Sequence, residues 1–229
     1  MPKILSIIPA RGGSKGLPNK NILSLAGKPL IAWSIEASKA SKYITKTVVS
    51  SDSKEILNIA KEYKADTINR PYFLALDDSS SESVVIHALD SVKENFDYII
   101  LLQPTSPLRD SSHIDKAFEL LLKSDADALI SVKEIDNKIL KAFMEDEKGN
   151  LKGIANNTFA FMPRQKLPKT YMSNGAIYII KTKTFLKNKS FFAKKTIKFL
   201  MDEVSSLDID SKEDFDKVDK IMEQNLLLV

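Results

Sequence analysis

The chain has 229 residues, a hydrophobic share of 43% and no cysteine, which allows one α/β domain with a small insert and excludes disulfides and thiolate sites. No apolar run approaches about twenty residues and the first residues lack the layout of a signal peptide, so we expect a soluble cytoplasmic protein without a membrane partner. The net charge of +4 suits anionic ligands but is too small to indicate nucleic acid.

Short continuous apolar runs alternate with helical spacing along the chain, which is typical of β–α–β units. In chain order, the predicted strands are residues 4–8, 47–50, 66–68, 98–102, 128–132, 176–180 and 197–200. The predicted helices are residues 30–37, 54–63, 82–93, 114–122 and 211–225. Because the run 98–102 is apolar throughout, we expect it to be a central strand of a mostly parallel sheet. The predicted fold class is therefore α/β.

The pattern loosens between residues 139 and 170, where asparagine and proline interrupt it. We interpret this segment as an insertion, in the form of a hairpin arm used for dimerisation. The predicted organisation is a core made of residues 1–138 and 171–229, with an inserted dimerisation arm over residues 139–170.

A loop rich in glycine and positive charge follows the first predicted strand, over residues 9–21. Its three glycines let backbone N–H groups approach a ligand, and Arg11, Lys15 and Lys20 add positive charge, which together suit a polyphosphate. The loop is neither a Walker A motif nor a dinucleotide fingerprint, because its glycine and lysine spacing differs from both. A flexible basic loop without a ligand is the alternative.

Four clusters, this loop included, lie at or near the ends of predicted strands, where open α/β sheets bind their ligands. The other three are Asn69-Arg70-Pro71, the segment Gln103 to Arg109, and the segment Leu207 to Asp210. Their common position predicts a single ligand site at one edge of the sheet.

Asp208 and Asp210 are two residues apart, so on an extended segment their carboxylates point the same way. Two converging carboxylates repel each other unless a cation lies between them, and Mg²⁺ favours oxygen ligands and substrate phosphates. The alternative is that one of these aspartates caps the last helix.

Phosphoryl chemistry at such a site needs a cation beside the reacting phosphorus, and Lys20 or Arg11 can supply it. A metal-held water or Asp210 is the candidate base. His87 and His113 fall in or near predicted helices, and we expect them to be structural or exposed.

The residues from Ile8 to Asn21 closely resemble the signature loop of the acylneuraminate cytidylyltransferases, the CMP–sialic acid synthetases. The resemblance continues in order through Arg70-Pro71, Leu102 to Arg109, Asn174 to Ile179 and Ser206 to Asp210. It implies a three-layer, Rossmann-like nucleotidyltransferase fold. The implied reaction joins CMP from CTP to a nine-carbon 2-keto sugar acid and releases pyrophosphate, with Mg²⁺ as cofactor.

The resemblance also implies roles for individual residues. Lys20, Arg11 and Asp210 would be catalytic, and Asp208 and Asp210 would hold the metal. CTP would be bound by Arg11, Ser14, Lys15, Asn21, Arg70 and Ser81. The sugar acid would be bound by Gln103, Lys141, Arg164, Tyr178, Phe191 and Phe192. The arm would cross to a second subunit of a homodimer, so that Lys141 and Arg164 complete the partner's site.

Several alternatives stay open from the residues alone. Ser81 can cap its helix, Phe191 and Phe192 can be ordinary core, and Lys141 can be solvated. A synthetase for the eight-carbon acid Kdo, a catalytically silent nucleotide-binding protein and an RNA-binding protein are the rival functions. The run Lys15 to Lys20 and the phenylalanine pair favour the sialic-type branch, and an RNA-binding aromatic platform is missing. The sequence does not identify the acid.

Overall fold

The computed structural model describes residues 2–226, and its centre is a seven-stranded sheet with the strand order β11-β7-β10-β6-β1-β4-β5. These strands are β1 (Ile4–Pro9), β4 (Lys46–Ser51), β5 (Asp66–Asn69), β6 (Tyr98–Leu101), β7 (Ala128–Ile135), β10 (Thr170–Lys181) and β11 (Thr196–Leu200). Neighbouring strands run parallel except around β10, which is antiparallel to both β6 and β7. The expectation of an α/β fold with a mostly parallel sheet is confirmed.

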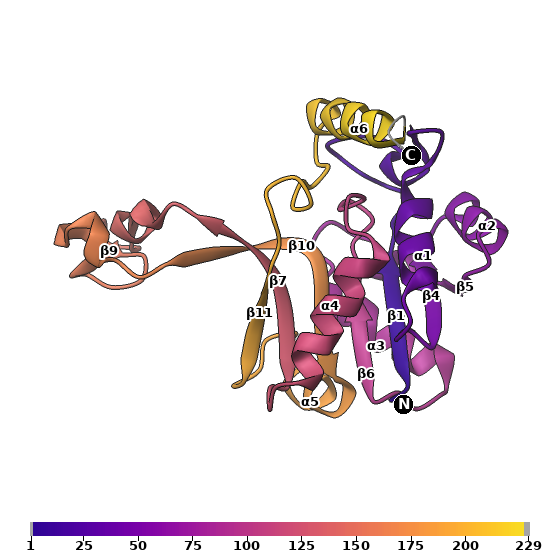
Figure 1. The fold of residues 1–229 in the computed structure, drawn as a ribbon, viewed down its shortest axis with the longest axis horizontal. Coiled ribbons are helices and arrows are strands. Elements are labelled where there is room, and N and C mark those ends of the chain that lie inside the picture. The colour runs from indigo at the N-terminus through magenta and orange to yellow at the C-terminus, as the bar shows by residue number, and fades with distance from the viewer. Residues whose placement is uncertain (1, 227–229) are drawn as a thin grey trace.

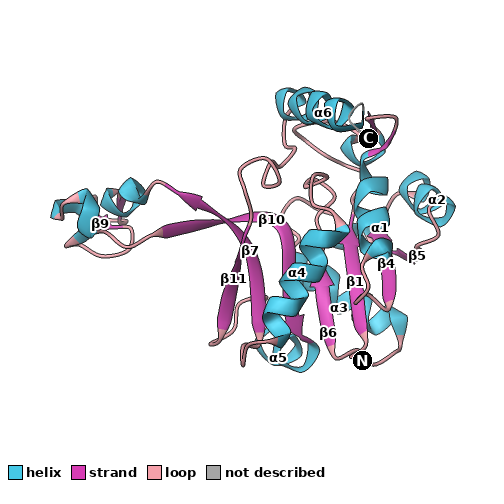
Figure 2. Ribbon diagram, viewed as in Figure 1, coloured by secondary structure: helices cyan, strands magenta, loops and turns pink. Residues whose placement is uncertain are grey.

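Helices cover both faces of the sheet, which gives three layers (Figures 1 and 2). One face packs against α1 (Leu30–Ala40), α2 (Lys54–Glu62) and α4 (Ser111–Leu122). The other face packs against α3 (Ser81–Val92) and α5 (Thr182–Asn188). The last helix, α6 (Lys212–Leu226), packs on the loop that follows β1 and on the hairpin of β2 (Ser24–Leu25) and β3 (Lys28–Pro29).

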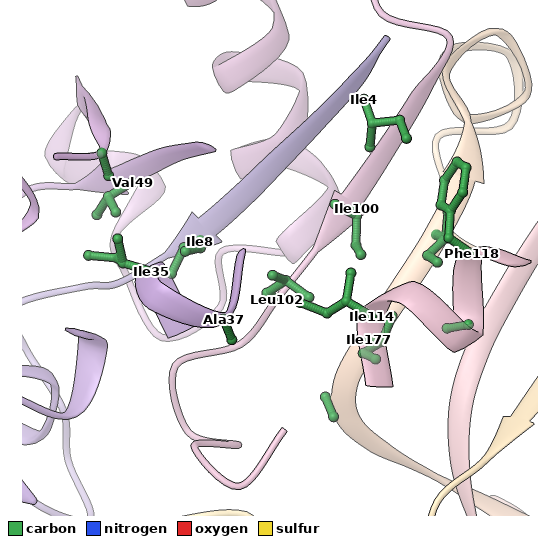
Figure 3. Close-up of a cluster of buried hydrophobic side chains, with 14 of the residues drawn as sticks. Ile4, Ile8, Ile35, Ala37, Val49, Ile100, Leu102, Ile114, Phe118 and Ile177 are labelled. Carbon is green, nitrogen blue, oxygen red and sulfur yellow. The ribbon is translucent and has the colours of Figure 1, made fainter. Parts of the chain in front are cut away.

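The central strand β1 shows why the sheet is buried on both sides. Ile4 and Ile8 point into one hydrophobic cluster, whereas Leu5 and Ile7 point into the other. This alternation is the two-residue period of a strand. Figure 3 shows the first of these clusters, where Ile8 lies among side chains of the sheet and α1.

Serine and aspartate side chains fix where several helices begin. Ser53 accepts a hydrogen bond from the Ile56 N–H at the start of α2, and Ser80 accepts one from Ser83 N–H at the start of α3. Ser80 is therefore the cap of α3, and Ser81 is its first helical residue. Pro29 lies directly before the first residue of α1.

The residues between β7 and β10 extend away from the sheet as an arm (Figure 1). The two strands keep pairing outward as far as Ile135 and Thr170. Beyond them lie the short elements η3 (Asn137–Lys141), β8 (Phe143–Glu145), β9 (Leu151–Gly153), η4 (Phe159–Phe161) and η5 (Arg164–Lys166). The use of this arm for dimerisation stays a prediction.

Among residues 2–226, no helix combines the length and the apolar character needed to span a bilayer. The cytoplasmic location stays a prediction.

Candidate active site

A cleft of about 600 Å³ lies beyond the carboxyl ends of β1, β5 and β6, and residues from all four strand-end clusters line it. The predicted site residues that line the cleft are Arg11, Ser14, Lys15, Lys20, Asn21, Arg70, Ser81, Gln103, Asp208 and Asp210. Segments far apart in the sequence thus meet at one edge of the sheet, as the strand-end rule predicts.

The glycine-rich loop touches the Asp208–Asp210 segment directly. A β-carbon on Gly16 would lie 2.4 Å from the backbone oxygen of Asp210, so only glycine allows this approach. Lys20 follows Asn19, which has a left-handed backbone with a φ of 55°, and Lys20 itself is only 8% exposed. The Lys20 ammonium donates to the Ile209 carbonyl at 2.5 Å and lies 3.3 Å from an Asp210 carboxylate oxygen. Lys20 therefore ties the loop to the Ile209–Asp210 segment.

Asp52 holds the other end of the loop. Its carboxylate accepts a hydrogen bond from the Gly12 N–H at 3.0 Å, and it lies 4.0 Å from the guanidinium of Arg70. The Asn21 amide donates to the Arg11 carbonyl at 3.0 Å. These contacts keep the loop in one conformation beside the cleft.

Arg70 has guanidinium N–H groups that are free to bind a ligand in the cleft. It is 6% exposed, and among the described residues its Nε and Nη2 atoms are buried without a hydrogen-bond partner. Burial lowers the pKa of Arg70, the charge of Arg11 lowers it further, and Asp52 opposes both effects. A buried guanidinium with free N–H groups that lines a cleft is suited to an anionic or carbonyl oxygen of a ligand.

Asp77 forms ion pairs with two cationic side chains of the loop. Its carboxylate lies 2.7 Å from the Arg11 guanidinium and 2.5 Å from the Lys15 ammonium. Hydrogen bonds from Lys15 and Arg11 hold the pKa of Asp77 below its usual value. These two side chains therefore already converge on one anionic group, as they would on a phosphate.

The two aspartates differ in environment. Burial raises the pKa of Asp208, and the charge of Asp210 adds to this, whereas a hydrogen bond from Thr105 opposes it. One Asp208 oxygen is buried and unpartnered within the described chain, while the Asp210 side chain is 81% exposed. Residues 2–226 contain no group of three or more His, Cys, Asp or Glu side chains around a metal position. Two carboxylates nevertheless fit Mg²⁺, which takes its remaining ligands from water and substrate phosphates.

Neither aspartate caps the last helix, so that alternative is wrong. Asp214 accepts hydrogen bonds from the Ser211 N–H at 2.9 Å and the Ser211 hydroxyl at 2.7 Å, and Ser211 caps α6 in return.

Comparison with known proteins identifies the fold around this cleft. The family described as cytidylyltransferase matches residues 5–229. The chain belongs to the cytidylyltransferase family.

Individual relatives narrow the family. The chain is 38% identical over 93% of its length to an N-acylneuraminate cytidylyltransferase of Escherichia coli, of which it spans 51%. It is 36% identical to a CMP-N,N'-diacetyllegionaminic acid synthase of Legionella pneumophila, with 97% of each chain covered. The fold is shared with a CMP:2-keto-3-deoxy-manno-octonic acid synthetase complexed with CTP, at a TM-score of 0.72 and 17% identity, over 97% of this chain and 99% of that one.

Five of the predicted site residues lie outside the cleft of this cytidylyltransferase. Lys141 and Arg164 are on the arm, where Arg164 pairs with Asp136 at 3.3 Å. Tyr178 packs on Phe191 with ring centroids 5.7 Å apart, and Phe191 is core at 6% exposure. Phe192 next to it is 67% exposed. A sugar-acid role for these five residues stays a prediction.

The two histidines also lie away from the cleft lining. His87 is in α3, and His113 forms the N-terminal cap of α4 together with Asp110, at 2.7 Å between the ring nitrogen and the carboxylate. This agrees with the expected structural roles.

The sequence interpretation missed Asp52, Asp77 and Thr105. Asp52 follows β4 directly, so the strand-end rule applies to it as well. Thr105 lies within the predicted cluster from Gln103 to Arg109, but its side-chain interaction with Asp208 was not predicted. Asp77 lies in a loop without periodicity, and no sequence pattern connects it with Arg11 and Lys15.

Proposed function

We propose that this protein transfers CMP from CTP to the anomeric hydroxyl of a nine-carbon 2-keto sugar acid, and releases pyrophosphate. The observation that carries the proposal is the meeting of the cationic glycine loop with Asp208 and Asp210 in one cleft of a cytidylyltransferase fold. The relatives named for sialic and legionaminic acids, at 36 to 38% identity, support a nonulosonic acid as the acceptor.

The triphosphate of CTP would replace the Asp77 carboxylate on Arg11 and Lys15. Both cations already converge on this carboxylate, at 2.7 and 2.5 Å, so an anionic oxygen in its place would be held by the same groups. Ser14 and Asn21 line the same part of the cleft and would add neutral donors. Arg70 and Ser81 would contact the nucleoside.

In the transfer step, the 2-hydroxyl oxygen of the acid forms a bond to the α-phosphorus, and the bond from that phosphorus to the bridging oxygen of pyrophosphate breaks. Lys20 would stabilise the negative charge on the oxygens of the α-phosphoryl group, because its ammonium is held at the cleft wall by the Ile209 carbonyl. Of the two carboxylates that line the cleft, Asp210 is the more exposed, and it would accept the hydroxyl proton.

Asp208 and Asp210 would together hold Mg²⁺, which when bound neutralises phosphate charge. The buried, unpartnered oxygen of Asp208 is consistent with a cation ligand, since burial otherwise disfavours its ionised form.

The sugar acid would bind beside Gln103, and a second subunit would complete its site. Lys141 and Arg164 lie on the arm outside the cleft of their own chain, so they would reach an acid only in the partner of a homodimer. An arginine such as Arg164 can bind a sugar carboxylate through two hydrogen bonds.

Pyrophosphate release tests the proposal. The purified protein is incubated with CTP, Mg²⁺ and, in separate reactions, N-acetylneuraminic, legionaminic, pseudaminic or Kdo acid. Release with a nine-carbon acid is expected, and the ranking of kcat/KM values identifies the substrate. Release with Kdo alone would move the protein to the eight-carbon class, and no release with any acid would overturn the proposal.

A further inference from the structure

We propose that Gly175, in an irregular segment of β10, positions the side-chain amide of Gln103 in the cleft and thereby sets the affinity for the sugar acid. This inference rests on the proposed function, because it takes Gln103 as part of the acid site. Gly175 would be a positioning residue that itself touches no substrate.

Gly175 lies where the pairing of β10 with β7 is interrupted. The register shifts between Ser173 and Tyr178, so the chain of β10 bulges out of the ladder at this point. Gly175 has a φ of +76°, a conformation that residues with a β-carbon rarely adopt.

The bulge brings the Gly175 backbone against the Gln103 amide. A β-carbon at Gly175 would lie 2.4 Å from Gln103 Oε1 and 3.5 Å from the amide carbon. Both atoms belong to the end of a flexible side chain, so an alanine here would displace the amide instead of the backbone.

The Gln103 amide is available to a ligand. Its backbone is fixed, because the carbonyl accepts hydrogen bonds from Ser34 Oγ at 3.4 Å and from the Ser106 N–H at 3.3 Å. The side chain lines the cleft, and no side-chain hydrogen bond holds its amide within the described part of the chain. Contact with Gly175 is thus a direct constraint on where the amide can lie.

A buried polar network locks the bulge in place. Asn174 is 5% exposed, and its amide accepts from Ser131 Oγ at 2.6 Å and donates to Ser206 Oγ at 2.9 Å. The Asn174 carbonyl accepts from Ser106 Oγ at 3.4 Å. Since Ser106 is in the Gln103 turn and Ser206 precedes Asp208, the bulge connects the acid side of the cleft with the aspartate segment.

The test compares Gly175→Ala with Gly27→Ala. Gly27 has a φ of +85° and no atom within 4 Å of a built β-carbon, so this variant carries the same backbone strain without the contact. Both variants should lose similar thermal stability. Only Gly175→Ala should lower kcat/KM for the acid, by roughly tenfold to a hundredfold, while the KM for CTP changes by less than about twofold.

A double variant distinguishes a positioning effect on Gln103 from a general disturbance of the fold. If Gly175 acts through Gln103, then Gly175→Ala should add little to the loss already caused by Gln103→Ala. Fully additive losses, or equal losses of kcat/KM in Gly27→Ala and Gly175→Ala, would overturn the proposal.

A second readout does not depend on turnover. The side-chain amide resonances of Gln103 in ¹⁵N-labelled protein, assigned by their absence in Gln103→Ala, should move in Gly175→Ala and stay in place in Gly27→Ala. If the wild-type protein turns over no nonulosonic acid, the proposed function fails while this spectrum still decides the positioning role. Unmoved resonances in Gly175→Ala would overturn it.

Discussion

At the scale of single residues, the cleft contains charged groups whose buried polar atoms have no hydrogen-bond partner in the described chain. Arg70 keeps unpartnered guanidinium nitrogens, and Asp208 keeps an unpartnered carboxylate oxygen, within the described chain. A buried polar group without a partner lowers stability by about 1–3 kcal/mol. Such groups are expected where a ligand supplies the missing partner.

Asp208→Asn should stabilise the metal-free protein at neutral pH. Burial raises the pKa of Asp208, so the folded state binds this proton more readily than the unfolded state does. The destabilisation is therefore complete above the raised folded-state pKa and disappears below the ordinary aspartate pKa of about 4. We expect a gain of about 1 kcal/mol, or roughly 3 °C in Tm, at pH 7 in EDTA, and none at strongly acidic pH.

Asp210→Asn is the matched control, because the Asp210 side chain is 81% exposed. It should bring no gain in Tm at either pH. Thermal unfolding of the three proteins at both pH values checks the prediction, and a loss of stability in Asp208→Asn at pH 7 would contradict it.

At the scale of elements, the loop after β1 depends on its contact with the aspartate segment. In Gly16→Ala, the new β-carbon would lie 2.4 Å from the Asp210 backbone oxygen, so the loop or the segment must move. We expect a loss of about 1–3 kcal/mol in the free energy of unfolding. Gly13→Ala, with no atom within 4 Å, should change it by less than about 0.5 kcal/mol. Urea denaturation measures both, and equal losses would show that the contact does not matter.

Much of this organisation could be predicted from the sequence. Five of the core strands, β1, β4, β5, β6 and β11, were found within a residue or two. The clearest is β6, a continuous apolar run whose side chains enter the hydrophobic clusters on both faces of the sheet. The strand β7 runs three residues further than predicted, to Ile135 in the arm. The polar strand ends were expected to meet, and the cleft brings them together. The length of β10 was underestimated, because its first third, from Thr170 to Ser173, pairs in the arm, where none of these four side chains is buried. The antiparallel direction of β10 has no signature in its own residues.

The missed parts of the site are those that depend on distant pairing. Asp77 reaches Arg11 and Lys15 across more than sixty residues of sequence, and a loop aspartate without periodicity gives no indication of its partner. The approach of Gly175 to Gln103 likewise depends on a register shift, which a single sequence does not encode in any local pattern.

At the scale of the whole molecule, the arm exposes large apolar side chains to solvent. Leu151 is 69% exposed and Phe161 is 84% exposed. Isolated two-stranded ribbons are marginal in water, so burial against a second subunit would stabilise the arm.

The protein should therefore run as a dimer of the 25.6 kDa chain in light scattering coupled to size exclusion. The double variant Leu151→Asp/Phe161→Asp should become monomeric and lose turnover while it still binds CTP. Leu186→Asp, on α5 and away from the arm, changes another exposed leucine and should stay dimeric. A monomeric wild-type protein with full activity would contradict the shared site.

The most direct test of the account follows the oxygen atom that joins sugar and nucleotide. The acid is labelled with ¹⁸O at its 2-hydroxyl, incubated with CTP and Mg²⁺, and the products are observed by ³¹P NMR. The account predicts that the label appears in the phosphodiester of a CMP-sugar in the wild-type protein, that the pyrophosphate is unlabelled, and that Lys20→Ala and Asp210→Asn form no product. Unlabelled product, label in pyrophosphate, or near-normal turnover in Lys20→Ala would contradict it.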